Sequence, residues 1–174
     1  MHVKGDERFH KVLLILRHAK SSWKNKKLDD HDRPLNRRGR REAIEMGEYL
    51  KKTNMIPNAI VTSSATRAIE TTTLVCRNCS YNKLVEVNFE FHRGGTNAYI
   101  HAISIAPNDK NILLIVGHNP DLEDLIKVIT NRTIKLPTCT LIQINMNIKN
   151  WKSTAIYGSF KSEIVNIWRP KRID

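Results

Sequence analysis

The sequence has no apolar run of the ~20 residues that a membrane-spanning helix needs, and its first eleven residues include acidic side chains and no apolar core. These absences argue against a membrane-spanning helix and a secretory signal, so we expect a cytoplasmic protein with no membrane partner. Residues 1–10 are predicted to form a short polar leader. No repeat or linker follows, so residues 11–174 are expected to form one domain.

Cysteine is scarce, with three residues in the chain, of which Cys76 and Cys79 form a C-x-x-C pair. A structural zinc site usually needs four ligands, and there is no second such pair. A redox pair normally lies at a helix N-terminus, where the helix dipole stabilises a thiolate. This pair falls at the end of a predicted helix, which favours two reduced thiols without a redox role.

Acidic residues are also few: 17 Asp and Glu stand against 29 Lys and Arg, giving a formal net charge of +12. This excess favours anionic partners such as phosphorylated substrates. The basic clusters Lys24–Lys27 and Arg37–Arg41 have no interleaved aromatic residues for base stacking, which disfavours nucleic acid. No carboxylate cluster with metal-ligand spacing is present, so we expect neither a metal ion nor another cofactor.

Three apolar segments have the composition of strands buried on both faces. Val12–Leu16 leads into Arg17 and His18, Ile112–Val116 leads into Gly117 and His118, and Ala59–Val61 leads into a segment with Arg67. Parallel neighbours would bring the two histidines and two arginines to one sheet edge, the edge at which open α/β sheets bind ligands.

The remaining pattern alternates helices with strands. Asn36 is a good N-cap for a first helix, Ser63 or Ser64 can cap a second, and Asn119 followed by Pro120 predicts the start of another. The other predicted elements are an extended segment Leu84–Phe91, a helix Asn97–Ile105, a hairpin of Leu141–Ile148 with Trp151–Tyr157, and a last strand Glu163–Trp168. This order predicts a single three-layer α/β/α sandwich with a mostly parallel mixed sheet.

The four basic groups have a chemistry in common. Arg17 and Arg67 can hold a phosphoryl group, one histidine can act as a nucleophile, and a protonated second histidine can stabilise the transferring oxygens. Each residue also has an ordinary structural explanation, for example a strand-end ion pair for Arg17 or a helix cap for His118. The recurrence of such residues at equivalent strand ends favours metal-free phosphoryl transfer.

These segments resemble the motifs of the histidine phosphatase (phosphoglycerate mutase-like) superfamily. Arg17–Trp23 (RHAKSSW) is similar to its R-H-G-x-S-x-W signature, and Leu35 with Gly39, Ser63–Thr71 and Gly117–Pro120 resemble its later motifs in the same order. Ala19, Arg33-Pro34-Leu35 and the G-H-N-P-x-L-E run through Glu123 resemble the compact SixA-type phosphohistidine phosphatase branch. The likeness covers nearly the whole chain and implies a phosphoglycerate mutase-like fold.

The resemblance implies a role for each site residue. His18 would be the nucleophile that becomes phosphohistidine, Arg17, Arg67 and His118 would bind and stabilise the phosphoryl group, and Ser21 would contact phosphate as well. A glutamate just after the third strand is the general acid in many members, which implies Glu90 here, with Asp32 as the second candidate.

The short stretch between the Arg67 helix and the Ile112 strand leaves little room for a large lid, and an open basic crevice would admit a protein-borne phosphohistidine. We therefore predict a metal-independent phosphatase for protein phosphohistidine that releases inorganic phosphate. The alternatives are a phosphatase for a small phosphorylated metabolite and a non-catalytic basic module that binds phosphoprotein or nucleic acid.

Overall fold

A computed structural model describes residues 11–156, 158 and 160–170 of the 174-residue chain; the predicted leader, residues 1–10, lies outside the described residues. The elements are β1 (Lys11–Arg17), η1 (Asp30–Asp32), α1 (Arg37–Lys52), β2 (Ala59–Ser63), α2 (Thr66–Cys79), β3 (Val85–Asn88), η2 (Phe89–His92), α3 (Gly95–Ser104), β4 (Ile112–Gly117), α4 (Asp121–Thr130), β5 (Leu141–Met146), η3 (Trp151–Ala155) and β6 (Ser162–Trp168), where η marks a 3₁₀ helix.

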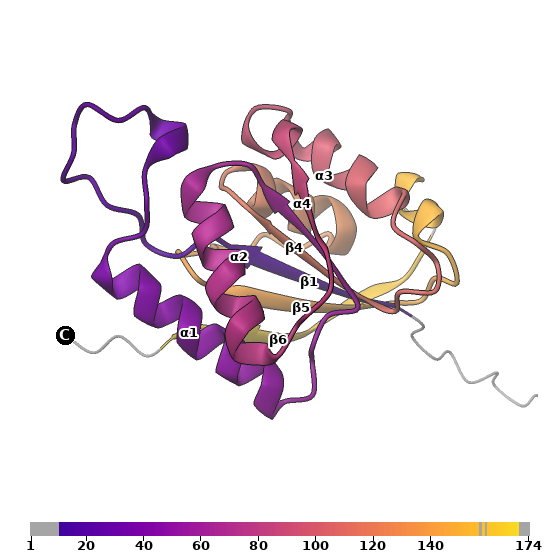
Figure 1. Ribbon diagram of the computed structural model, residues 1–174. Helices are drawn as coiled ribbons and strands as arrows, with labels where there is room; N and C mark the ends of the chain where they lie inside the picture. The colour runs from indigo at the N-terminus through magenta and orange to yellow at the C-terminus, as the bar shows by residue number, and fades with distance from the viewer. Residues whose placement is uncertain (1–10, 157, 159, 171–174) are drawn as a thin grey trace, which may run out of the picture.

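The strands form one six-stranded sheet in the order β3-β2-β4-β1-β5-β6. The first four are parallel neighbours, whereas β5 runs antiparallel to β1 and β6 antiparallel to β5. Helices α1 and α2 cover one face of this sheet and α3 and α4 the other (Figure 1). The predicted three-layer sandwich with a mostly parallel mixed sheet is therefore confirmed, and it contains no large insertion.

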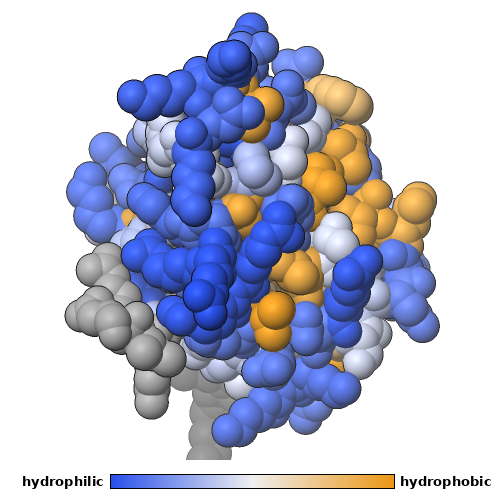
Figure 2. Space-filling model, turned by 60° about the vertical axis from the view of Figure 1, so that its left-hand side comes forward, coloured by the Kyte–Doolittle hydropathy of each residue, from blue (hydrophilic) through white to orange (hydrophobic). Residues whose placement is uncertain are grey.

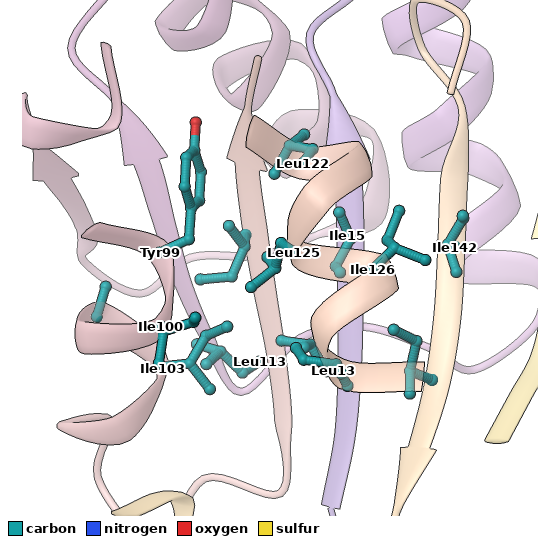
Figure 3. Packing of buried hydrophobic residues seen from close by; sticks show 14 of the residues in the cluster. Leu13, Ile15, Tyr99, Ile100, Ile103, Leu113, Leu122, Leu125, Ile126 and Ile142 are labelled. Carbon is teal, nitrogen blue, oxygen red and sulfur yellow. The ribbon is translucent and has the colours of Figure 1, made fainter. Parts of the chain in front are cut away.

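The two central strands explain why their sequences lack polar alternation. Leu13 and Ile15 of β1 pack beneath α3 and α4 (Figure 3), whereas Leu14 and Leu16 pack beneath α1 and α2, and all four are fully buried. Burial of each such side chain stabilises the fold by about 1.5–3 kcal/mol. The same division holds along β4, where Leu113 and Ile115 face α3 and α4, and Leu114 and Val116 face α1 and α2. Buried side chains therefore cover both faces at the centre of the sheet.

Helix α1 begins as predicted and reaches close to the loop that follows β1. The side chain of Asn36 accepts a hydrogen bond of 2.8 Å from the backbone N–H of Gly39. A Cβ on Gly39 would collide with the backbone carbonyl of Lys20. Glycine at this position therefore lets the helix start press against the loop after His18.

Two predicted helix starts are wrong by one or two residues. Helix α2 has Ala65 as its N-cap, because the Ser63 hydroxyl lies at the end of β2, where it contacts His118. Helix α4 starts at Asp121 with Pro120 as the N-cap, because the Asn119 side chain turns away to other partners.

The predicted hairpin is also wrong. Residues from Trp151 to Ala155 form η3, and β5 pairs with β6 instead of with this segment. The indole of Trp151 is fully buried, and its N–H donates to the carbonyl of Lys110 at 2.8 Å. Docking of this large ring under the sheet edge outweighs the strand propensity of the segment. The last strand is confirmed, one residue longer than predicted; Tyr157, the end of the predicted hairpin strand, lies outside the described residues.

The segment after α2 is shorter as a strand than predicted. Only Val85–Asn88 pairs with β2, and the chain then turns into η2 over Phe89–His92 because Phe91 folds into the core. Helix α3 begins at Gly95, two residues before the predicted start. These shifts place His92 next to the end of the sheet that carries the site described below.

Cys76 and Cys79 lie in the last turn of α2, as predicted, and both are free thiols. Burial raises the pKa of Cys76 to about 11 and also raises the pKa of Cys79. Both thiols are therefore held in the protonated, unreactive form at neutral pH.

The outer surface is largely polar. Hydrophilic side chains cover most of the face in Figure 2, and hydrophobic residues gather in its upper right part and reach towards its centre. None of the helices in the described part of the chain combines the length and apolar character needed to cross a lipid bilayer.

Candidate active site at the carboxyl ends of β1, β2 and β4

The parallel pairing of β1 with β4 places Arg17 opposite Gly117, so His18 and His118 follow at the same sheet edge. The backbone N–H of His18 donates to the carbonyl of Gly117 at 3.1 Å. Arg67 reaches the same edge from the first turn of α2. A crevice of about 370 Å³ opens there, lined by Arg17, His18, Lys20, Ser21, Trp23, Asp30, Arg33, Arg67, His118, Asn119 and Thr138. The structure thus brings together the four basic residues that we predicted to meet.

The two ring nitrogens of His18 have different partners. Nδ1 lies 2.8 Å from the carbonyl oxygen of Ala19, which can only accept, so Nδ1 carries the proton. Nε2 is then unprotonated and accepts a hydrogen bond of 3.2 Å from Nε of Arg67. Burial, followed by the charges of Arg67 and Arg17, lowers the pKa of His18 to about 3. His18 is therefore a neutral imidazole with its Nε2 lone pair directed at the arginine, the form that a nucleophile requires.

Arg67 is buried and held in place by Asp30. Its Nη2 donates to Oδ2 of Asp30 at 3.0 Å, and its Nη1 donates to the backbone carbonyl of the same residue. The Arg67 guanidinium in turn lowers the pKa of the Asp30 carboxyl group against the effect of desolvation, so this residue is ionised at neutral pH. The carboxylate thus orients a cation in the crevice without leaving a buried charge unpaired.

His118 lies beside His18, with the ring centroids 5.0 Å apart and the planes tilted by 52°. Its Nε2 is 2.8 Å from the hydroxyl of Ser63, and its Nδ1 is buried with no hydrogen-bond partner among the described residues. Burial, and then the neighbouring His18 and Arg67, lower the pKa of His118 to about 2. An anion between the two rings would favour protonation of His118, because it would offset these effects.

Arg17 has one satisfied and one unsatisfied donor. Its Nη1 donates to the carbonyl of Leu136 at 2.8 Å, whereas the buried Nε has no partner among the described residues. Buried polar atoms normally have a partner. The unpaired Nε of Arg17 and Nδ1 of His118, both belonging to residues that line one crevice, fit a ligand with several acceptor oxygens and at least one donor or bridging water.

Sequence reasoning assigned no role to Arg33, which the structure places in the crevice wall. It is buried, pairs with Oδ1 of Asp30 at 2.6 Å and donates to the hydroxyl of Ser21. Its guanidinium carbon lies 3.2 Å from the ring centroid of Trp23, which is 69% exposed at the crevice. The Arg33-Pro34-Leu35 motif was the available signal, but no pattern in the sequence showed that this arginine pairs with the same carboxylate as Arg67.

The two candidate general acids, Glu90 and Asp32, are both exposed, and neither is among the residues that line the crevice. Glu90 is exposed on η2 and is not among the residues that line the crevice, so its role stays a prediction. Asp32 is also exposed and pairs with His31, with 3.0 Å between Oδ1 and Nδ1. Ser21 does line the crevice, with its hydroxyl engaged by Arg33.

The two low imidazole pKa values predict an acid sensitivity of the fold. The pKa of an unfolded histidine is near 6.5. Below that pH, His18 and His118 are therefore protonated in the unfolded chain but remain neutral in the folded protein. The stability contributed by the neutral rings is present above about pH 6.5 and is lost as the pH falls towards about 3. We therefore expect the His18→Gln/His118→Gln double variant to lose less free energy of unfolding than the wild type between these pH values.

Urea unfolding at a series of pH values measures this difference. His101→Gln, at an exposed histidine of α3, is the matched control and should keep the wild-type slope. Equal slopes for the double variant and the wild type would contradict the prediction.

The comparison with known families decides where the chain belongs. The histidine phosphatase superfamily (branch 1) matches residues 13–104, more than half of the chain. This chain is a member of the histidine phosphatase superfamily. An uncharacterized chloroplastic protein of Arabidopsis thaliana is 29% identical to this chain over 151 residues, covering 80% of this chain and 68% of the relative. An uncharacterized protein of Mycobacterium tuberculosis is 30% identical, covering 67% and 70% of the two chains.

Solved structures show the same compact fold. The SixA protein from Nakamurella multipartitia has a TM-score of 0.80 at 20% identity and covers 92% of this chain and 96% of its own. A protein histidine phosphatase SixA in complex with tungstate has a TM-score of 0.77 at 17% identity and covers 91% and 96%. Phosphoglycerate mutases also match a segment of this chain, for example one from Streptomyces avermitilis at 41% identity over 64 residues. Membership therefore supports a phosphatase or a mutase.

Proposed function

We propose that this chain is a metal-independent phosphatase that transfers a phosphoryl group to Nε2 of His18 and then to water, and that its substrate is a phosphohistidine borne by a protein. The observation that carries the proposal is the state of His18: a neutral ring, with Nδ1 bound to the Ala19 carbonyl and Nε2 facing Arg67 at 3.2 Å. A fixed lone pair in a basic crevice is what attack on phosphorus requires.

The neighbouring residues supply the electrostatic part of the reaction. Arg67 and Arg17 are the cations for the non-bridging phosphoryl oxygens, and their binding would occupy the unpaired Nε of Arg17. His118, 5.0 Å from His18 between ring centroids, would gain a proton beside the bound anion and donate to a third oxygen. In the second step water attacks phosphorus, the bond to Nε2 breaks, and inorganic phosphate leaves.

Access to the crevice supports a protein substrate over a small metabolite. The segment between α2 and β4 forms β3, η2 and α3, and none of its residues is among those that line the crevice. Trp23, 69% exposed, lies at the crevice and offers a large apolar surface to an incoming partner. A phosphohistidine side chain can enter such a site while its protein remains outside.

A comparison of substrates tests this proposal. We expect kcat/KM for a phosphohistidine-bearing protein to exceed that for each of a panel of sugar phosphates by at least about 10²-fold, with chelator present throughout. A sugar phosphate that is hydrolysed as efficiently as the phosphoprotein would replace the proposed substrate class by a small metabolite.

A further inference from the structure

Four imidazoles form a continuous row that begins at the proposed nucleophile. The ring centroids are 5.0 Å apart from His18 to His118, 5.7 Å from His118 to His92, and 5.2 Å from His92 to His31. The rings come from four separate segments, which follow β1, follow β4, end η2 and lie within η1. The row thus links the crevice to residues that no motif singled out.

The outer end of the row reaches solvent. The His31 side chain is 40% exposed, and its Nδ1 lies 3.0 Å from Oδ1 of Asp32, which is itself 60% exposed. The Nε2 of His31 lies 3.0 Å from the hydroxyl of Ser64. The polar groups of the His31–Asp32 pair are therefore in contact with water.

His92 lies between the partly exposed His31 and the buried His118. It is partly buried, and its ring stands edge-on to both neighbours, at 78° to His118 and 82° to His31. Neither of its ring nitrogens hydrogen-bonds to a residue that the structure describes. His92 does not itself line the crevice, so a water molecule or a substrate group beside His118 would have to reach its ring.

The charges that face His92 come from several elements. Burial, and then Arg67 on α2, His31 and Arg93 after η2, lower the pKa of His92, whereas Asp30 raises it. A phosphoryl dianion held by Arg67 would add a second favourable charge. Proton uptake by His92 is thus coupled to occupation of the crevice.

We propose that His92 is the proton donor to the leaving group, and that the His31–Asp32 pair connects it to solvent. The inference rests on the proposed phosphatase function and deepens it, because it names the group that completes proton transfer. Neither Glu90, the residue implied by the family pattern, nor His92 lines the crevice. Glu90 is exposed on the same turn, whereas the ring centroid of His92 lies 5.7 Å from that of His118, which does line the crevice.

The proposed phosphoryl transfer has two steps, and His92 exchanges one proton in each. In the first, the bond from Nε2 of His18 to phosphorus forms, the bond from phosphorus to the leaving atom breaks, and the imidazolium of His92 gives its proton to that atom, directly or through one water. In the second, water attacks phosphorus, the bond to Nε2 breaks, and neutral His92 takes the proton of the water. Phosphate leaves and His92 is protonated again.

A pair of aryl phosphates separates proton donation from all other effects. The leaving oxygen of 4-nitrophenyl phosphate departs without a proton, whereas that of phenyl phosphate needs one. We expect His92→Gln to lower kcat/KM for phenyl phosphate by about 10²-fold and for 4-nitrophenyl phosphate by no more than about threefold. The second step should also slow, so the variant should show a burst of 4-nitrophenol in pre-steady-state measurements.

Companion variants make each outcome decisive. His101→Gln, at an exposed position of α3, should match the wild type on both substrates. Equal losses on both substrates in His92→Gln would mean that the ring only supports His118, and the proposal would be wrong. A loss confined to phenyl phosphate in Glu90→Gln but absent in His92→Gln would assign the acid to Glu90. Failure of the phosphatase function itself would appear differently, as equal inertness of wild type and His18→Ala.

Discussion

Replacing His18 by alanine is expected to lower kcat/KM for an aryl phosphate by at least about 10³-fold, or about 4 kcal/mol of transition-state stabilisation. The reason is geometric: the phosphoryl group loses the unprotonated nitrogen Nε2, which is oriented by the Nδ1 contact with Ala19 at 2.8 Å and by Arg67 at 3.2 Å. The surrounding cations remain, so phosphate should still bind.

The intermediate gives this prediction a second readout. Wild-type enzyme quenched during turnover should carry one acid-labile phosphoryl group on His18, detected by mass spectrometry, and the alanine variant should carry none. His101→Ala, at an exposed histidine, is the matched control and should behave as the wild type. Full activity of the His18→Ala variant, or a label on another residue, would disprove the nucleophile assignment.

The second large effect is expected for Arg67. Changing it to alanine should lower kcat/KM about 10³-fold, because the phosphoryl oxygens lose a buried cation and Nε2 of His18 loses its hydrogen-bond donor. Arg67→Lys should restore only part of the loss, because a lysine carries the charge but not the forked pair of donors that contacts both Asp30 and the crevice.

Arg77→Ala provides the control, because this arginine lies on the same helix but is exposed and faces away from the crevice lining. Affinity for vanadate or inorganic phosphate, measured by calorimetry, separates binding from turnover. If Arg67→Ala binds phosphate as tightly as the wild type, the guanidinium does not hold the phosphoryl group, and the site as described is wrong.

The strand ends that carry the site are visible in the residue order. Five consecutive apolar residues, Val12–Leu16, can be buried only if both faces of the strand are covered, and the Arg17-His18 pair must then emerge at its end. The same argument applies to Ile112–Val116 before His118. Periodicity and polarity are properties of neighbouring residues, so they can be interpreted without knowledge of the fold.

Competing local preferences account for the misplaced elements. The sequence predicts that Trp151 begins the second strand of a hairpin, yet its burial against Lys110 and Asn108 sets the backbone as a 3₁₀ helix. The Ser63 hydroxyl was assigned to a helix cap, yet it lies beside His118. In both cases a partner far away in the chain outweighs the local signal.

Residue order thus identified the buried strands and the kinds of side chain at their ends. It could not show that Nε2 of His18 is the unprotonated ring nitrogen, that Asp30 holds Arg67, or that His92 stands edge-on between two other imidazoles. Those facts depend on side chains that meet across separations of 49 residues for His18 with Arg67 and 37 for Arg67 with Asp30. Contacts of that kind follow from the packing of helices on the sheet, and no local pattern in the chain records them.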